Sequence, residues 1–255
     1  MLYLALLADG GGGARPLVLA GRNAHRSFLS AAALLDFDVE WLRPQPADNR
    51  LTCRVPPDAL DARLAALPHR PAAVYVTSPD YLGHMVDVAG LSAVCRRYGV
   101  PLLVDNAHGA YLRFLPADAH PMTLGADMCC DSAHKTLPVL TGGAYLHISA
   151  SAPPLFAENA ARAMALFAST SPSYLILQSS TAPTRIADGC RAVWRTVSAV
   201  WTNAAIGCAG GLYPRRDEPL KLTVPKSYGY TGGALAALLR AQGLSANSRT
   251  PTTLC

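Results

Sequence analysis

The sequence carries little charge and no long uninterrupted apolar run. Only 15% of its 255 residues are charged, and its 22 basic residues are scattered rather than gathered into a stripe. Nucleic-acid binding is therefore not expected. The longest early apolar segment, Met1 to Ala8, stops at Asp9. It is far shorter than the roughly 18–20 residues that a membrane span needs, and it lacks the basic start of a secretory signal, so no membrane partner is expected.

Paired cysteines of the C-x-x-C kind, which many zinc sites use, are also missing. The seven cysteines form no such pair, and their number is odd. We therefore expect no metal, and reduced, mostly buried thiols in a cytoplasmic protein.

Apolar residues make up 51% of the chain, enough for a large core. From about residue 16 to 150, short aliphatic runs alternate with longer amphipathic ones, which predicts βαβ units and a mainly parallel sheet. The expected strands are Pro16 to Ala20, Val39 to Leu42, Ala73 to Val76, Leu102 to Asp105, Ala126 to Asp131 and Ala144 to Ile148. The expected helices are Ala24 to Leu35, Asp58 to Leu67 and Val86 to Tyr98.

The pattern changes after residue 150. Pro153 to Phe167 is expected to be a helix, and a long apolar stretch from Tyr174 to Ala209 is expected to be mostly helical. From Pro219 onward the chain resembles the start of a second α+β unit. The sequence therefore predicts a large domain over residues 1–212 and an incomplete small domain over 213–255, with Gly10 to Gly13 as a loop.

Polar side chains follow four of the expected strands, at the edge where ligands bind in open parallel sheets. They lie in the segments Arg22 to His25, Thr77 to Tyr81, Asp105 to His108 and Ser132 to Lys135. Singly, each has an ordinary explanation: a histidine or aspartate after a strand often caps the next helix, and a lone lysine is usually solvated.

Together these residue types favour one chemistry. A lysine desolvated at the mouth of a crevice becomes nucleophilic toward an aldehyde, so Lys135 can form a Schiff base. A pyridine ring held there needs a carboxylate near its nitrogen, which Asp105 can supply. Donors in the turn from Ser132 to His134 suit a phosphate. His25 could stack on the exposed face of the ring.

Two motifs resemble one known family. Leu103-Val104-Asp105-Asn106-Ala107-His108 and Asp131-Ser132-Ala133-His134-Lys135-Thr136-Leu137 are similar, in residues and spacing, to segments of the ornithine/lysine/arginine decarboxylases, a group of fold-type I pyridoxal-phosphate enzymes. Supporting similarities lie at Arg22 to Ser27, Val76 to Gly83, Thr170 to Leu175 and Pro219 to Thr223. The resemblance covers nearly the whole chain.

The resemblance implies an α/β fold of the aminotransferase-like type with pyridoxal 5'-phosphate as cofactor. By position, Lys135 would hold the cofactor, Asp105 would pair with the ring nitrogen, and Ala107 and His25 would flank the ring. Ser132 and His134 would lie near the phosphate, with His108 and Thr77 as further contacts. The implied reaction is decarboxylation of a basic amino acid to an amine, as in polyamine metabolism, by a homodimer or higher homo-oligomer.

The chain also departs from the family pattern. Asn106 stands where many relatives carry glutamate, at a position to which no chemical role is assigned. Pro138 to Gly143 differs from the usual glycine-rich step, so cofactor geometry or substrate choice is expected to differ. Relatives carry a phosphate-binding Gly-Ser/Thr turn upstream of the segment that Met1 to Ala8 resembles, so the chain is expected to be an internal piece of a longer enzyme. Two alternatives remain open: another fold-type I reaction (aminotransferase, desulfurase or aldolase), and a non-catalytic remnant.

Overall fold

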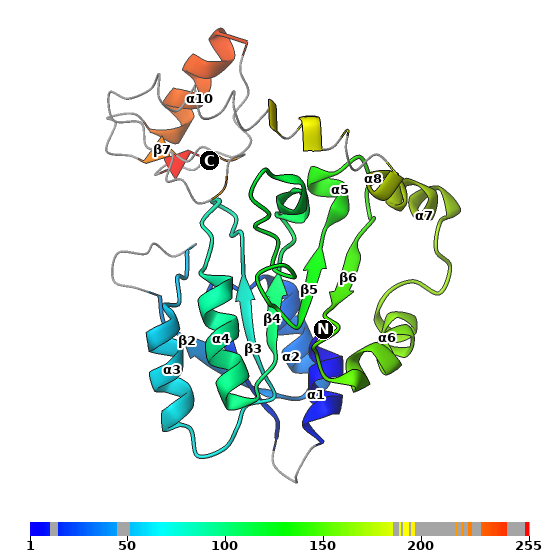
Figure 1. The fold of residues 1–255 in the computed structure, drawn as a ribbon. Coiled ribbons are helices and arrows are strands. Elements are labelled where there is room, and N and C mark those ends of the chain that lie inside the picture. Colours follow the sequence, from blue (N-terminus) through cyan, green and yellow to red (C-terminus); the bar gives the residue numbers. More distant parts are fainter. Residues whose placement is uncertain are drawn as a thin grey trace.

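A computed structural model describes residues 1–10, 15–44, 52–185 and 231–243, together with residues 189, 191–193, 195–196, 218, 221, 224–225 and 253–254. The chain folds around a twisted sheet with helices on both faces (Figure 1). The predicted boundary between residues 212 and 213 lies outside the described residues, as do most of the predicted loop after Gly10 and most of the predicted helical stretch beyond residue 185.

The sheet has six strands in the order β2-β1-β3-β4-β5-β6. Neighbouring strands are parallel except for β6, which pairs antiparallel with β5. This confirms the predicted mainly parallel α/β fold. The strands are β1 (Leu17–Gly21), β2 (Asp38–Leu42), β3 (Ala73–Thr77), β4 (Leu102–Asp105), β5 (Met128–Asp131) and β6 (Tyr145–Ile148).

Strand β5 begins two residues later than the sequence predicted. Asp127 has a buried side chain, and its Oδ2 accepts a hydrogen bond from the Leu102 amide at 2.8 Å. A side chain thus takes the place of a ladder partner at this point, and regular pairing starts at Met128.

The helices of the sheet domain are α1 (Leu2–Asp9), α2 (Arg26–Leu35), α3 (Pro57–Ala66), α4 (Val88–Tyr98), η1 (Ala110–Phe114), α5 (Ala133–Thr136), α6 (Pro154–Phe167), α7 (Tyr174–Ser180) and α8 (Ala182–Arg185). Farther along the chain lie α10 (Gly232–Ala241) and the short antiparallel pair β7 (Val224–Pro225) and β8 (Thr253–Leu254). Figure 1 shows α10 and β7 beyond the carboxyl ends of the parallel strands.

Local sequence signals explain where α4 begins and ends. The Asp87 side chain accepts a hydrogen bond from the Gly90 amide at 2.9 Å and so caps the first turn. Arg96 and Arg97 lie in the last turn, where positive charge favours the helix dipole. Gly99 then adopts φ 64°, a left-handed conformation that glycine tolerates best, and the helix stops.

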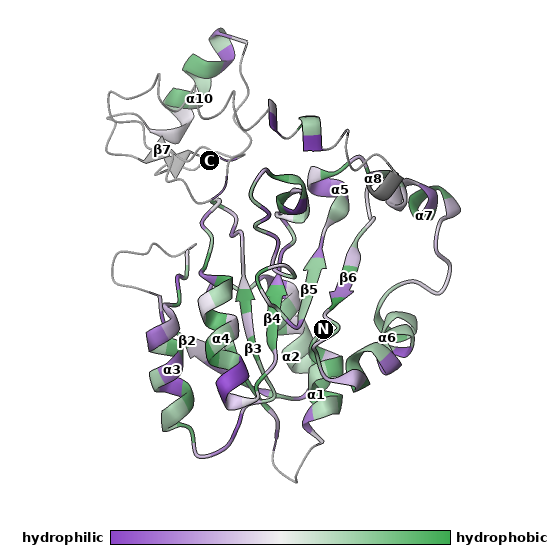
Figure 2. Cartoon of the chain, viewed as in Figure 1, coloured by the Kyte–Doolittle hydropathy of each residue, from purple (hydrophilic) through white to green (hydrophobic). Residues whose placement is uncertain are grey.

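Alternate residues of the strands build two apolar layers, one on each face of the sheet. On one face, Val74, Val76 and Val104 pack with α3 and α4. On the other face, Tyr75 and Leu103 pack with α1, α2 and α6. Figure 2 shows hydrophobic colouring along β3 and β4, whereas α3 carries hydrophilic residues. A strand buried on both faces is typical of the centre of a parallel sheet.

No helix of the described residues is long and apolar enough to cross a membrane.

Leu103→Ala tests this two-sided core. Leu103 is fully buried in β4, so the change is expected to lower the free energy of unfolding by about 2–5 kcal/mol. Leu29→Ala is the control: Leu29 is 53% exposed, and its truncation is expected to change stability by no more than about 0.5 kcal/mol. Urea denaturation measures both. Equal losses for the two variants would contradict the proposed packing.

Candidate functional site

Parallel pairing brings the carboxyl ends of β3, β4 and β5 to one edge of the sheet. In register, Thr77 lies opposite Asp105, and Asp105 lies opposite Cys130. Two of the predicted site residues, Thr77 and Asp105, are therefore neighbours in the ladder. The crevice beyond such strand ends is where open α/β sheets bind their ligands.

The Asp105 carboxylate is held by donors on both of its oxygens. Oδ1 accepts from the Ala107 amide at 3.1 Å, and Oδ2 accepts from the Tyr75 hydroxyl at 3.0 Å. Burial, followed by the negative charge of Asp105, raises the pKa of Tyr75 well above its usual range, so the hydroxyl keeps its proton. A carboxylate offers about four lone-pair sites, and so Asp105 can still accept a further donor.

Lys135 lies in the short helix α5 and reaches toward the segment that follows Asp105. Its Nζ is 3.4 Å from His108 Nε2, and it is exposed to solvent. This exposure contradicts the desolvated crevice that the sequence predicts for Lys135. The exposure follows from the helix geometry, because Ala133 and Leu137 point into the core and Lys135 lies between them on the opposite side.

His108 is the centre of a group of polar and aromatic side chains. Its ring lies 6.0 Å from that of Tyr81 in an edge-to-face arrangement. Burial, then the positive charges of Lys221 and Lys135, lower the pKa of His108 to about 4. His108 is therefore neutral at physiological pH.

The remaining predicted site residues have mostly local partners. His25 is exposed and caps α2, its Nδ1 accepting from the Ser27 amide at 3.3 Å. His134 Nδ1 hydrogen-bonds with the Gly143 carbonyl at 2.9 Å. Ser132 precedes α5 without capping it through its side chain. The structure thus places these side chains near the strand ends, while their roles toward a cofactor stay predictions.

Among the described residues, several buried polar atoms near this edge have no hydrogen-bond partner. They include Thr77 Oγ1, at the end of β3, and Asn23 Oδ1, just after β1, as well as Asn106 Oδ1 and Thr136 Oγ1. An unpaired buried polar atom is costly and calls for an explanation, of which a bound polar ligand is one. The unpaired atoms, the fixed Asp105 carboxylate and the Lys135 amine are together a donor and acceptor set that fits a phosphorylated pyridine aldehyde.

Two residues of this region, Tyr75 and Lys221, were not predicted from the sequence. Tyr75 is two residues before Thr77 on the same strand, so strand alternation could have placed it on the Asp105 side of the sheet. Lys221, whose Nζ donates to the Asp80 carbonyl at 3.1 Å, gave no such signal because it comes from a distant part of the chain.

A proton titration of His108 checks the charge environment of the site. Because the folded pKa is about 4, below the usual 6.5, neutral His108 favours the folded state, and this contribution is lost as pH falls from about 6.5 through 4. Lys135→Ala removes one of the positive charges that lower this pKa. We expect the pKa of His108 to rise while burial keeps it below 6.5. NMR titration of the histidine ring protons measures it, and a wild-type value of 6.5 or more would contradict this description.

The sequence of this chain is similar to a known protein family and to individual members of it. Residues 10–200 match the family model described as the major domain of Orn/Lys/Arg decarboxylase. The uncharacterized protein YaaO of Bacillus subtilis (strain 168) is 36% identical over 138 residues, covering 52% of this chain and 28% of YaaO. An arginine decarboxylase of the same organism is 30% identical over 135 residues, covering 51% and 27%. The chain therefore matches less than a third of the length of these relatives.

Solved structures agree on the fold. An alanine–glyoxylate aminotransferase from Nostoc sp. superposes with a TM-score of 0.70 at 16% identity, covering 99% of this chain and 72% of that one. Mouse CSAD in its apo form superposes with a TM-score of 0.62 at 17% identity, covering 99% and 63%. The sheet is thus that of the fold-type I enzymes. Since the family model spans most of the sequence, the chain belongs to the Orn/Lys/Arg decarboxylase major-domain family.

Proposed function

We propose that this chain is the cofactor-binding part of a pyridoxal-phosphate-dependent decarboxylase that acts on a basic amino acid. One observation carries the proposal: Lys135 contacts His108, three residues after Asp105, at the strand-end edge that also holds the buried hydroxyl of Thr77, which has no partner among the described residues. When bound, pyridoxal phosphate supplies an electron-withdrawing ring that stabilises the negative charge left by the departing carboxylate.

Asp105 would hold a proton at the nitrogen of the ring. Its two oxygens are already fixed by the Ala107 amide and the Tyr75 hydroxyl, so the carboxylate is oriented before any ligand arrives. Such preorganisation is the main way in which proteins stabilise charge during catalysis. Tyr75 is then a positioning residue, which acts through Asp105.

Lys135 would attach the cofactor, and His108 would orient it. A lysine ammonium group only donates, so Nε2 of the neutral His108 ring accepts from it. His108 thereby orients the Nζ of Lys135 toward the segment that follows Asp105.

The other predicted residues complete the proposal. His25 and Ala107 would flank the ring, and Thr77 would donate to a ring substituent. Ser132 and His134 would lie near the phosphate, and the bond from His134 Nδ1 to the Gly143 carbonyl would fix the orientation of the His134 ring.

The proposal extends to organisation and setting. Residues 1–212 would form the large domain and 213–255 the start of a small one, in a cytoplasmic homodimer or higher homo-oligomer. Exposed apolar side chains on α6 and α7 favour association: Met164, Leu166, Phe167, Tyr174 and Leu175.

Lys135→Ala tests cofactor attachment. Mixed with pyridoxal phosphate, the wild-type protein is expected to show the visible absorption band of a lysine-bound cofactor, and borohydride reduction followed by peptide mass spectrometry should find the label on Lys135. The variant should lose both signals. Lys221→Ala is the matched control, because Lys221 also lies near His108. A label that persists in Lys135→Ala and vanishes in Lys221→Ala would show that the cofactor attaches to Lys221 and would contradict the proposal.

Asp105→Asn tests the reaction. Removing the carboxylate is expected to lower carbon dioxide release from arginine, lysine or ornithine by about a hundredfold or more. Tyr75→Phe removes one hydrogen bond to Asp105, worth about 1 kcal/mol, and should cost roughly fivefold. Gas release is measured alongside keto-acid and sulfide formation over a panel of amino acids. Keto acid or sulfide without carbon dioxide would assign a different fold-type I reaction.

A further inference from the structure

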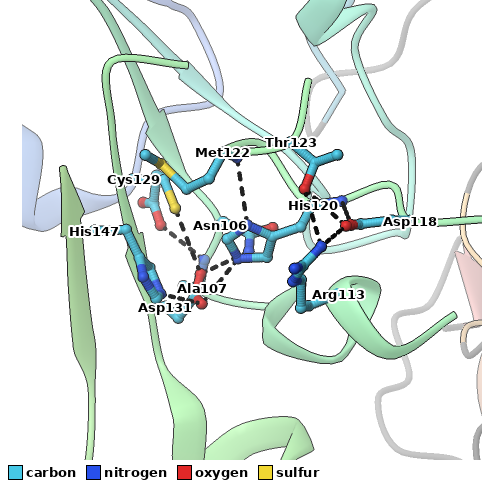
Figure 3. Close-up of polar contacts among 11 residues, drawn as sticks. Asn106, Ala107, Arg113, Asp118, His120, Met122, Thr123, Cys129, Asp131 and His147 are labelled. Atoms are coloured by element: carbon cyan, nitrogen blue, oxygen red, sulfur yellow. Dashed lines mark hydrogen bonds and ion pairs between the residues drawn. The ribbon is translucent and has the colours of Figure 1, made fainter. Parts of the chain in front are cut away.

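A second group of polar side chains surrounds Asp131, at the end of β5. Its Oδ2 accepts from His120 Nε2 at 3.0 Å and from His147 Nε2 at 2.9 Å. Its Oδ1 accepts from the Asn106 side chain at 2.6 Å and lies 3.9 Å from Cys129 Sγ. Figure 3 shows His120 and His147 on two sides of Asp131, with Cys129 close by. The group joins four segments: β5, β6, the loop before β5 and the turn after β4.

These side chains are of the types that bind zinc-like divalent cations. One ligand atom each from His120, Cys129, Asp131 and His147 lies within 4.8 Å of all the others. Zinc bonds of about 2.1 Å in a tetrahedral site put neighbouring ligand atoms roughly 3.4 Å apart. The separations from the Asp131 oxygens are 2.9 Å and 3.0 Å to the two histidines and 3.9 Å to the cysteine, on both sides of that value. The four ligand atoms would move from separations of up to 4.8 Å to reach one ion.

A cavity gives such an ion a way in. It has a volume of about 420 Å³, and its walls include His120, Asp131 and His147, with Tyr145 and Arg113 nearby. Cys129 is fully buried behind them, whereas the His147 side chain is 37% exposed. An ion bound here would face the cavity on one side, so it could reach its ligands through the cavity.

Binding an ion would change the protons of its ligands: both histidines would bind through Nε2 atoms that now donate to Asp131, and the Cys129 thiol would release its proton to solvent. The Met122 amide donates to His120 Nδ1 at 3.3 Å, whereas a metal-bound imidazole carries its proton on that nitrogen. At 3.3 Å this is a long hydrogen bond, and a modest movement of the loop would release it. Without an ion, both imidazoles donate to the carboxylate, and so the buried Asp131 remains satisfied.

We propose that His120, Asp131 and His147, with Cys129 as fourth ligand, bind a divalent transition-metal ion of the zinc type at the wall of this cavity. The ion would clamp β6 and the loop before β5 onto the end of β5. None of the four residues is among those assigned to the cofactor. The metal site therefore stands or fails independently of the proposed decarboxylase.

Metal retention is the first test. The full chain is incubated with zinc salt and desalted, and bound zinc is measured by mass spectrometry. We expect about one ion per chain and a rise in Tm with added zinc. His147→Gln should lower zinc affinity at least tenfold and abolish the rise in Tm, and this half-exposed position tolerates substitution well. His69→Gln, at an exposed histidine after α3, is the control and should retain zinc.

Cobalt substitution then identifies the ligands. Co²⁺ in the site is expected to show the visible absorption of a tetrahedral complex together with a sulfur-to-metal charge-transfer band, which Cys129→Ser should remove. An unchanged band would exclude Cys129 as a ligand. The proposal is overturned if folded wild-type protein, checked by circular dichroism, retains no metal. It is equally overturned if His147→Gln binds zinc as the wild type does.

Discussion

The parallel pairing of β3, β4 and β5 is the constraint on which the rest of the molecule depends. It requires buried residues on both faces of the central strands, and it sets Thr77, Asp105 and Cys130 side by side where these strands end. Because each strand leaves the sheet at the same edge, side chains that are far apart in sequence meet there. The core and the candidate site thus have one common cause.

The turn after β4 separates two chemical environments. Asp105 and Asn106 are consecutive residues, and consecutive side chains of a strand point to opposite faces of the sheet. Asp105 meets Tyr75 on the face covered by α1, α2 and α6, whereas Asn106 donates to Asp131 on the other side. The turn therefore touches both the proposed cofactor site and the proposed metal site.

Charge and burial differ between these two places. Around His108, burial and nearby lysines keep a histidine neutral. Around Asp131, burial alone would raise the pKa of the carboxyl, but hydrogen bonds from His120 and His147 outweigh it, and the pKa lies well below its ordinary value. In both places the sheet fixes the position of the titratable side chain. The charged and hydrogen-bonding groups that the loops bring near it then determine its protonation state.

The sequence alone determined the sheet, the approximate bounds of its strands and the family, because these depend on apolar periodicity and on short motifs such as Ser132-Ala133-His134-Lys135 whose residues are contiguous. It also named Asp105 and Lys135. Only the tertiary structure decided that Tyr75 holds Asp105, that Lys135 is exposed beside His108, and that His120 and His147 meet at Asp131. Such contacts join residues separated by up to thirty positions, and no local pattern encodes which distant side chain a folded loop will bring within hydrogen-bond reach.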